Sequence, residues 1–381
     1  MSVERKLNLV QADFHMHWGG QAEVVLSLSK SLSRMGQNVT VVSPPGSALE
    51  KRATESGLKT FGGCRFRKGM RLFALYRDVN NLGSFLRDQA IDIYHCHGSQ
   101  DHWAGALAMS RYALPVQIVR TRHNIYPVHN HVFNRWLFQR QTARVITLFS
   151  DQHVSLTKSG LLPADRLFTL HSPLPAEFCQ GLPVQPLLRS ELHLPPAARL
   201  IGYVANLHPD KAPFDFIDAA EQIGAQFPDT HFAIAGFGPL EHDVAARVRN
   251  GKCPDRIHVL GFRKDILPVM ASLDLIVLPS VAREASSTVL KQAGSLGIPA
   301  VASNLGGTRE IIEDGVTGLL FPPGDTAALV EKMAAMLRDP EKSREMGQRA
   351  KTKVLAEFSA DAIASRTQEL YRTILAAGAS H

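Results

Sequence analysis

Residues 275–302, LIVLPSVAREASSTVLKQAGSLGIPAVA, contain the pattern that decides the fold. A short apolar run, Leu275–Leu278, ends at Pro279, and a helical run leads from there to a second apolar run at Ala300–Ala302. Short apolar runs separated by a helix are typical of parallel strands that are buried on both faces. This stretch therefore predicts one strand–helix–strand unit of a parallel sheet.

The same alternation extends along the chain in two blocks. In the first block we expect strands at Leu7–Ala12, Val39–Ser43, Ile91–Cys96, Val116–Thr121, Val145–Leu148 and His153–Leu156, and helices that include Gln21–Met35 and Leu82–Gln89. In the second block we expect strands at Leu200–Val204, His231–Ala235, Ile257–Leu260, Leu275–Leu278 and Ala300–Ala302. The fold class is therefore α/β, with two doubly wound parallel-sheet domains, and we expect ligands at the carboxyl ends of the strands in the cleft between them.

Length and composition support two globular domains. A chain of 381 residues is too long for one hydrophobic core, and 45% hydrophobic residues exclude a largely disordered protein. The proline-rich stretch that begins with His171–Pro175 and continues at Gly181–Pro183 is the predicted boundary, between residues 172 and 173. No run of 18 apolar residues is present, and the four cysteines are scattered singly, so we expect a cytoplasmic protein without a membrane-spanning helix.

Positive charge is concentrated in the first half of the chain. The net charge is +7, and the first 175 residues contain 21 Lys and Arg against 11 Asp and Glu. In the segment Arg65–Arg77, basic residues alternate with bulky apolar ones, as in segments that lie on acidic lipid headgroups. A solvated loop and helix face explains the same pattern equally well. Nucleic acid is the weaker candidate because no binding motif accompanies the charge.

Several turns at predicted strand ends contain residues suited to an anionic ligand. Gly19-Gly20 opens a helix after the first strand but lacks the G-x-G-x-x-G dinucleotide pattern. Lys211 follows the first strand of the second block, where a lysine can neutralise phosphate. Two further glycine turns, Gly236–Gly238 and Gly306-Gly307, also follow predicted strands.

The segment after Pro279 has the densest set of polar residues. Ser287 and Thr288 are helix-capping types, and a helix that starts there presents its positive end to a phosphate. Glu284 lies just before them. The alternative is structural: one of these hydroxyl residues caps the helix, and Glu284 pairs with Arg283 or Lys291.

In this order the motifs resemble those of family 4 retaining glycosyltransferases with the GT-B fold. The order is G-Y-V-A-N-L-x-x-x-K, G-F-G-P, L-G-F, P-S, E-x7-Q, G-I-P-A-V-A-S and G-G-x-x-E-I-I-x-D-G-x-T-G. The first half adds Gly19-Gly20, the pair His95 and His97, and the stretch Thr121–Asn124. The resemblance covers essentially the whole chain and implies an N-terminal acceptor-side domain, 1–172 with the final helix 359–381, and a nucleotide-sugar donor domain, 173–358.

The resemblance implies a catalytic set that works without a metal or other cofactor. Glu284 would hold hydroxyls of the donor sugar, and Lys211 would stabilise the leaving diphosphate. Ser287 and Thr288 would offer backbone N–H groups to the phosphates. Positive groups placed where negative charge develops are the largest expected source of catalysis.

The remaining residues that the resemblance implies lie in glycine turns and around the sugar and base. Gly20 and Gly307 would allow close backbone approach to the donor. His123 would sit over the sugar and help place the acceptor. Phe262 and its neighbours would line the base.

Two positions depart from the family pattern. The second glutamate of E-x7-E, which holds the ribose hydroxyls, is Gln292 here, and its amide can still accept and donate hydrogen bonds. The arginine expected five residues before the lysine is Asn206, which removes one positive charge from the phosphate site.

Three histidine pairs, His15/His17, His95/His97 and His129/His131, would each lie on one face of an extended strand. A zinc site is conceivable there. No acidic or cysteine ligand pattern accompanies the pairs, so we interpret them as core, cleft or acceptor-site histidines.

The sequence thus predicts a retaining, metal-independent glycosyltransferase on the inner face of the cytoplasmic membrane. Its donor is a nucleotide-diphosphate sugar, with UDP favoured, and its acceptor is a lipid-linked or lipopolysaccharide-type glycan. Two alternatives stay open: a catalytically degenerate binding or scaffold protein, which Asn206 and Gln292 would favour, and a nucleotide-sugar epimerase or hydrolase.

Overall fold

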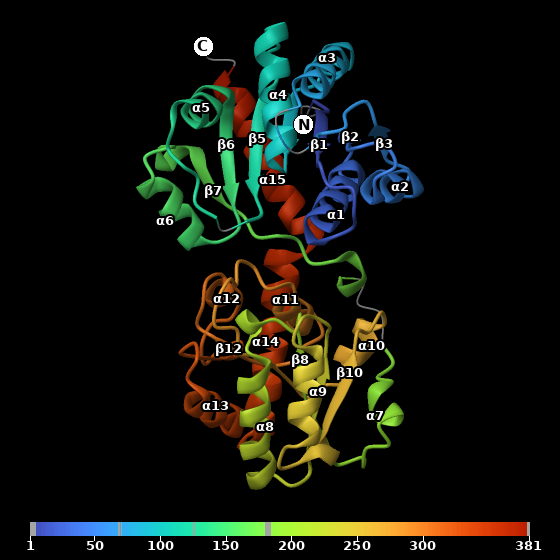
Figure 1. Cartoon of the computed structure of the whole chain (residues 1–381), viewed down its shortest axis with the longest axis vertical. Coiled ribbons are helices and arrows are strands. Elements are labelled where there is room, and N and C mark those ends of the chain that lie inside the picture. Colours follow the sequence, from blue (N-terminus) through green and yellow to red (C-terminus); the bar gives the residue numbers. More distant parts are fainter. Residues whose placement is uncertain (1–4, 68, 70, 125, 180–183, 379–381) are drawn as a thin grey trace. The chain divides into compact units, whose positions relative to one another are not determined.

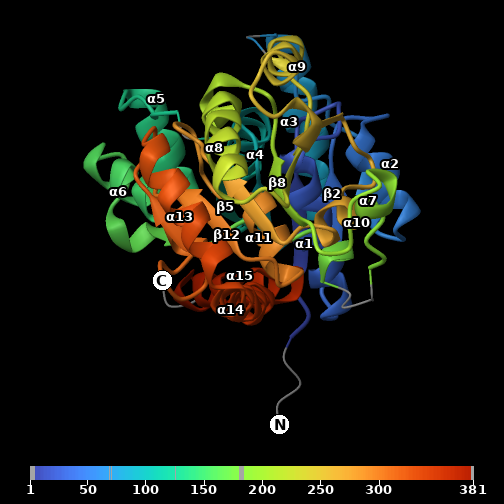
Figure 2. The same ribbon diagram turned by 90° about the horizontal axis from the view of Figure 1, so that it is seen from below.

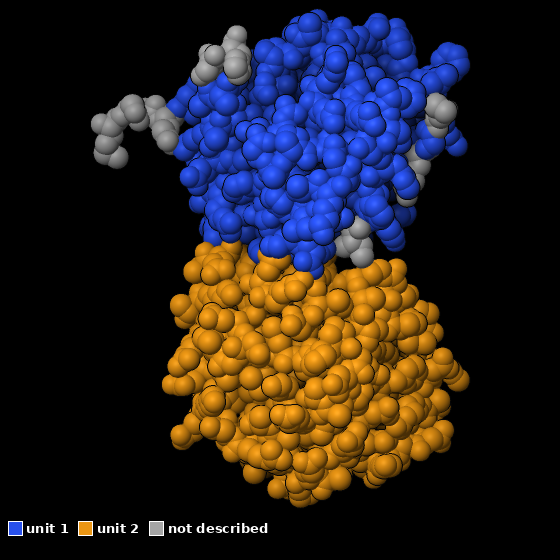
Figure 3. All heavy atoms as spheres, turned by 90° about the vertical axis from the view of Figure 1, so that its left-hand side faces the viewer, with its two compact units in different colours: residues 1–175, 359–381 blue, residues 176–358 orange. Residues whose placement is uncertain are grey.

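The computed structural model describes residues 5–67, 69, 71–124, 126–179 and 184–378 (Figure 1). The chain divides into two compact units (Figure 3). Unit 1 comprises residues 1–175 and 359–381, and unit 2 comprises residues 176–358. Gly181–Pro183, in the predicted boundary, and Lys68 and Met70, in the basic segment, lie outside the described residues.

Unit 1 is built on a seven-stranded parallel sheet in its described part. The strand order is β3-β2-β1-β4-β5-β6-β7. The strands are β1 (Asn8–Ala12), β2 (Asn38–Val42), β3 (Lys59–Phe61), β4 (Ile93–Cys96), β5 (Gln117–Arg122), β6 (Thr142–Thr147) and β7 (Leu167–Thr169). All residues of β4 are buried, because helices cover both faces of the sheet.

The helices of unit 1 form two layers. One face of the sheet packs against α3 and α4, and the other face packs against α1 and α15. The clusters of buried residues show this arrangement, and it can be followed in Figures 1 and 2. The α-helices are α1 (Gly20–Arg34), α2 (Ala48–Glu55), α3 (Leu72–Asp88), α4 (Ser99–Tyr112), α5 (Val132–Arg135), α6 (Ser150–Lys158) and α15 (Ala360–Gly378). A π-helical turn, Trp136–Gln141, continues α5.

Unit 2 has a six-stranded parallel sheet in its described part, in the order β10-β9-β8-β11-β12-β13. The strands are β8 (Arg199–Val204), β9 (Thr230–Ala235), β10 (Ile257–Gly261), β11 (Leu275–Leu278), β12 (Ala300–Ser303) and β13 (Leu319–Phe321). Both sheets thus have the Rossmann-like order 3-2-1-4-5-6, and unit 1 adds a seventh strand.

The helices of unit 2 also lie on both faces of their sheet. Helices α8, α9 and α13 contribute to the core on one face, and α14 lies on the other (Figures 1 and 2). The helices are α7 (Leu188–Glu191), α8 (Pro213–Gln226), α9 (Glu241–Arg249), α10 (Ile266–Ala271), α11 (Thr288–Ser295), α12 (Thr308–Ile311), α13 (Thr326–Arg338) and α14 (Pro340–Phe358).

One predicted strand is wrong. His153–Leu156 belongs to α6, not to the sheet. Its buried residues are Gln152 and Leu156, four apart, whereas Val154 is 47% exposed. A strand would place Val154 and Leu156 on one face, so the burial follows the helical repeat. Three short strands, β3, β7 and β13, were not predicted, because three residues are too few to show a period.

Candidate functional site

The order of the unit 2 sheet brings two distant loops together. The chain runs outward in opposite directions from β8 and β11, which pair in parallel at the centre of the sheet. At such a reversal the loops after the two central strands diverge and leave a crevice for a ligand. The loop after β8 carries Lys211, and the loop after β11 carries Glu284.

Lys211 and Glu284 form an ion pair. Lys211 Nζ lies 2.5 Å from Glu284 Oε2, and their side chains are 23% and 7% exposed. Ser280 Oγ donates to the same carboxylate oxygen at 2.9 Å. The structure therefore joins two predicted site residues that lie 73 positions apart in the sequence.

Asp210 ties the two loops together. Its carbonyl oxygen accepts from the N–H of Val281 at 2.8 Å, and its carboxylate pairs with Arg283. Arg283 has a left-handed φ of 54°. Neither Asp210 nor Ser280 was among the predicted site residues, although Asp210 stands next to Lys211. The sequence also allowed an ion pair between Glu284 and Arg283, but in the structure Arg283 pairs with Asp210 instead.

The Gly306-Gly307 turn holds the backbone of Glu284. The N–H of Gly307 donates to the carbonyl oxygen of Glu284 at 3.0 Å. Gly306 has φ +54°, and a Cβ there would lie 2.0 Å from that oxygen. Glycine is required at this position because any side chain would clash with the backbone of the Glu284 loop.

Helix α11 begins beside Glu284. Ser287 is its N-cap, and its hydroxyl accepts from the N–H of Leu290 at 3.3 Å, as the structural alternative predicted. Thr288 is the exposed first residue, and Gln292 is buried one turn later. The N–H groups of a first helical turn have no partner within the helix, so this end of α11 can receive an anion.

Lys291 is a fully buried lysine on α11. Its ammonium group donates to Ser286 Oγ at 3.1 Å. Burial lowers its pKa to about 7, although the nearby Glu284 carboxylate opposes this shift. The sequence placed Lys291 only as a possible partner of Glu284.

Asn206 and Phe262 follow two strands of the unit 2 sheet, β8 and β10, which are separated by β9. Asn206 is exposed after β8, and its Oδ1 would lie 2.6 Å from a Cβ on Gly238. Phe262, after β10, is 60% exposed and meets the ring of Phe237 edge to face, with centroids 5.3 Å apart. These exposed rings form an apolar rim at the same edge of the sheet as Lys211.

Gly20 and His123 belong to unit 1. Gly20 opens α1 after the extended N-cap Gly19, and a Cβ at either glycine would meet nothing within 4 Å. The conformation therefore does not demand glycine, but the bare backbone is open to a ligand.

His123 ends a buried chain of hydrogen bonds. His97 Nε2 donates to Gln11 Oε1 at 2.9 Å, so His97 Nδ1 accepts from His123 Nε2, also at 2.9 Å. On the other side, Gln11 Nε2 donates to the Tyr371 hydroxyl, which also contacts His95 Nδ1. Burial lowers the pKa of His95 and of His123 to about 3, so these imidazoles are neutral at pH 7.

Acid should therefore destabilise unit 1. An unfolded histidine takes up a proton near pH 6.5, whereas His95 stays neutral in the folded state down to about pH 3. The unfolded state then binds more protons, and the free energy of unfolding falls as the pH drops from about 6.5 towards 3. Each such histidine contributes a slope of up to about 1.4 kcal/mol per pH unit.

Thermal midpoints measured at pH 7, 6 and 5 test this expectation. We expect His95→Gln to be less stable at pH 7 but to lose less stability on acidification than the wild type. His242→Gln, whose side chain is 91% exposed, should retain the wild-type slope. Equal slopes for the wild type and His95→Gln would contradict this account.

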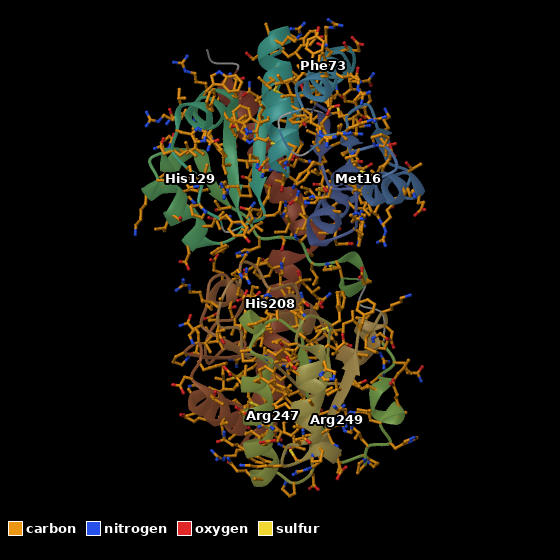
Figure 4. All side chains as sticks on the ribbon, viewed as in Figure 1. Met16, Phe73, His129, His208, Arg247 and Arg249 are labelled. Atoms are coloured by element: carbon orange, nitrogen blue, oxygen red, sulfur yellow. The ribbon has the colours of Figure 1, made fainter. Side chains whose placement is uncertain are left out.

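The histidine pairs do not form a metal centre in the described part of the chain. No group of three or more His, Cys, Asp and Glu side chains there is arranged to hold a metal ion. His129 and His131 lie in the loop and cap before α5 (His129 is labelled in Figure 4). In the same described ranges, no helix is long and apolar enough to cross a membrane.

The fold and the site define a class of protein. Two Rossmann-like parallel-sheet domains, one with a lysine, a glutamate and a helix N-terminus at its topological switch point, are the architecture of a GT-B glycosyltransferase. The family model "Glycosyltransferase Family 4" matches residues 18–185, and "Glycosyl transferases group 1" matches residues 184–353. The chain therefore belongs to the family 4 glycosyltransferases with the GT-B fold, and it is a glycosyltransferase enzyme.

Individual proteins agree with this assignment. N-acetyl-alpha-D-glucosaminyl L-malate synthase of Bacillus anthracis is 25% identical over 302 residues, 78% of either chain. UDP-Gal:alpha-D-GlcNAc-diphosphoundecaprenol alpha-1,3-galactosyltransferase of Escherichia coli is 23% identical over 322 residues, 79% of this chain and 81% of that one. The structure of Anabaena Alr3699/HepE in complex with UDP superposes with a TM-score of 0.80 at 20% identity, covering 96% of this chain and 100% of that chain.

Proposed function

We propose that the protein transfers a sugar with retention from a nucleotide-diphosphate sugar, with UDP the favoured nucleotide, to a lipid-linked or lipopolysaccharide-type glycan. The observation that carries this proposal is the Lys211–Glu284 pair at the switch point of the unit 2 sheet, beside the start of α11. Relatives whose names specify UDP-Gal and a diphosphoundecaprenol-linked sugar support the choice of donor and acceptor class.

Each residue of the pair has a role in this reaction. Lys211 neutralises the diphosphate that leaves when the anomeric bond breaks, together with the N–H groups at Ser287 and Thr288. Glu284 accepts hydrogen bonds from hydroxyls of the donor sugar. In the absence of donor its carboxylate is held by Lys211 and Ser280. No divalent metal is needed to balance the diphosphate charge in this scheme.

The other predicted residues have further roles in the proposed reaction. Gly20 and Gly307 present bare backbone to the donor, Phe262 borders the base, and Gln292 bonds the ribose through its amide. Asn206 supplies a neutral contact where the family has arginine. His123, a neutral imidazole in unit 1, helps to place the acceptor.

We further propose that the enzyme works on the inner face of the cytoplasmic membrane. Near the start of α3, Leu72, Phe73 and Tyr76 are 68%, 94% and 57% exposed (Phe73 is labelled in Figure 4). Arg65, Arg67, Arg71 and Arg77 accompany them. Exposed aromatic and aliphatic side chains among arginines are suited to an anionic lipid surface.

Vesicle sedimentation tests the membrane contact. Replacing Arg65, Arg67, Lys68 and Arg71 with Ser should reduce binding to vesicles that contain anionic lipid, by about 1 kcal/mol per charge near the surface. Replacing four exposed basic residues of unit 2, Arg249, Arg338, Lys342 and Arg349, with Ser controls for net charge. Unchanged vesicle binding by the first variant would refute the proposal.

A transfer assay tests the reaction itself. The protein is incubated with UDP-sugars and a diphosphate-linked glycolipid, with and without EDTA, and NMR identifies the anomeric configuration of the new bond. We expect transfer with retention that EDTA does not abolish. Inversion, or release of free sugar at the same rate with and without acceptor, would contradict the proposal. UDP binding without any turnover would support the scaffold alternative instead.

A further inference from the structure

Two buried arginines face a polar cavity in unit 1. The cavity has a volume of about 270 Å³ and lies beside β5 and the residues that follow it. Arg120 and Arg122 line it and are 5% and 7% exposed. Because they are two residues apart on one strand, their side chains leave the same face of the sheet, opposite to Thr121.

Both guanidinium groups are incompletely bonded. Arg120 Nη1 and Arg122 Nε are buried without a hydrogen-bond partner. Arg122 otherwise bonds only neutral oxygens, the side-chain carbonyl of Asn124 and the backbone carbonyl of Tyr126. A buried donor left without a partner is costly, and a buried charge without a counter-charge more so. The site is therefore built to be completed by something that binds there.

The charge of the cavity is positive. Arg120 interacts with Asp101, whose Oδ2 already accepts from the N–H groups of His97 and Gly98. Asp101 in turn interacts with Asp13, and neither carboxylate lines the cavity, whereas both guanidinium groups do. Burial and the charge of Arg120 lower the pKa of Arg122 to about 10, and the same surroundings keep His102 neutral. An anion with several oxygens would supply both the missing charge and the missing acceptors.

A second, apolar cavity shares a wall with the first. It has a volume of about 590 Å³ and lies between α3 and α4. Ser99 and Trp103, at the start of α4, line both cavities. Its apolar lining includes Leu75, Leu107 and Phe133, and its charged lining includes Arg67 and Arg71. The two cavities together offer an anion site next to a hydrocarbon site, with Ser99 and Trp103 between them.

We propose that these cavities bind the lipid-linked acceptor, with its phosphate or diphosphate on Arg120 and Arg122 and the first part of its hydrocarbon chain between α3 and α4. The inference rests on the proposed function, because it identifies where that acceptor binds. Arg122 ends β5, and His123 follows it directly in the chain. Neither arginine was a predicted site residue.

Isothermal titration with three probes tests the site in the full-length protein. The probes are farnesyl diphosphate, inorganic pyrophosphate and farnesol, which represent the whole amphiphile, its head and its tail. We expect the wild type to bind farnesyl diphosphate more tightly than either part. Arg122→Gln should bind both diphosphates ~10- to 100-fold more weakly, because it loses a charge-assisted hydrogen bond, and farnesol unchanged. Leu107→Gln should weaken the binding of farnesyl diphosphate and farnesol but not the binding of pyrophosphate.

Arg87→Gln is the matched control, since Arg87 lies in unit 1 with its side chain 58% exposed. It should bind all three probes like the wild type. Without probe, Arg122→Gln should unfold at or above the wild-type temperature, because it removes a buried charge that bonds only neutral oxygens, whereas Arg120→Gln should be less stable because the buried Asp101 carboxylate loses its cation. Pyrophosphate should raise the midpoint of the wild type but not that of Arg122→Gln.

Farnesyl diphosphate bound equally by the wild type and both arginine variants would overturn the inference. So would lower midpoints for both variants with unchanged probe affinity, which would mark the arginines as structural. Measuring UDP binding and sugar transfer by the same variants separates a failure of this inference from a failure of the proposed function. If UDP binding and sugar transfer are normal and the substitutions of Arg120 and Arg122 affect neither, the proposed function stands and the proposed acceptor site is wrong. If the probes bind as expected but UDP does not bind, the proposed acceptor site stands and the proposed donor reaction is wrong.

Discussion

Replacing Lys211 with alanine is expected to slow sugar transfer ~10²–10³-fold, the effect of removing one preorganised group that stabilises developing negative charge. The proposed leaving group is a diphosphate, and Lys211 is the cation that the structure places against Glu284 at the switch point of unit 2. Because the diphosphate already carries charge in the ground state, the variant should also bind UDP more weakly. Steady-state transfer and UDP titration measure the two effects.

Lys252→Ala is the control for this variant, since Lys252 is an exposed lysine of the same unit. It should transfer sugar at the wild-type rate. Full transfer activity of Lys211→Ala would show that Lys211 has no role in the reaction. A folded Lys211→Ala protein that binds UDP as tightly as the wild type would contradict the expected contact between Lys211 and the diphosphate.

Replacing Glu284 with alanine is the second large expected effect. A hydrogen bond to a charged group contributes about 1.5–3 kcal/mol, so the loss of one or two bonds to sugar hydroxyls predicts at least a ~10- to 100-fold lower kcat/KM. UDP lacks the donor sugar whose hydroxyls Glu284 would hold, so the affinity for UDP should change little. The variant should therefore lose affinity for the UDP-sugar relative to UDP.

Glu284→Gln refines this result. It can still accept from Ser280, but it lacks the negative charge that faces Lys211. An intermediate loss of transfer is expected. If Glu284→Ala instead weakens UDP and UDP-sugar equally, the carboxylate acts on the phosphate site through Lys211 and not on the sugar.

Most of the sheet framework follows from local sequence. Runs such as Leu275–Leu278 and Ala300–Ala302 are continuous, apolar and bounded by turns, because both faces of a parallel sheet are covered. The region 153–156 was misassigned because four residues, of which only Val154 and Leu156 are apolar, are too few to separate a strand from a helical turn. The buried residues Gln152 and Leu156 are four positions apart, which is the spacing of one helical face.

The site shows the same division between local and distant signals. Lys211 and Glu284 stand out because each ends a strand–turn motif, and the sheet order then brings them together. The link from Asp210 to Arg283 and the link from His95 to Tyr371 join elements far apart in sequence, so no local spacing predicts them. Arg120 and Arg122 had a local signal, because they stand two positions apart at the end of a strand, but burial was needed to separate them from surface charge.

The central claim is that the carboxyl edge of the unit 2 sheet binds the diphosphate of a nucleotide sugar. A thermal-shift comparison of UDP, GDP, ADP, TDP and CMP tests it most directly, with Lys211→Ala measured alongside. A ligand at about 100 times its Kd adds about 2.7 kcal/mol, which moves the midpoint of a 150–250-residue domain by ~2–4 °C per kcal/mol. We predict a shift of several degrees with one nucleoside diphosphate, UDP, and a smaller shift in Lys211→Ala. No shift with any nucleotide, or equal shifts in the two proteins, would contradict the account.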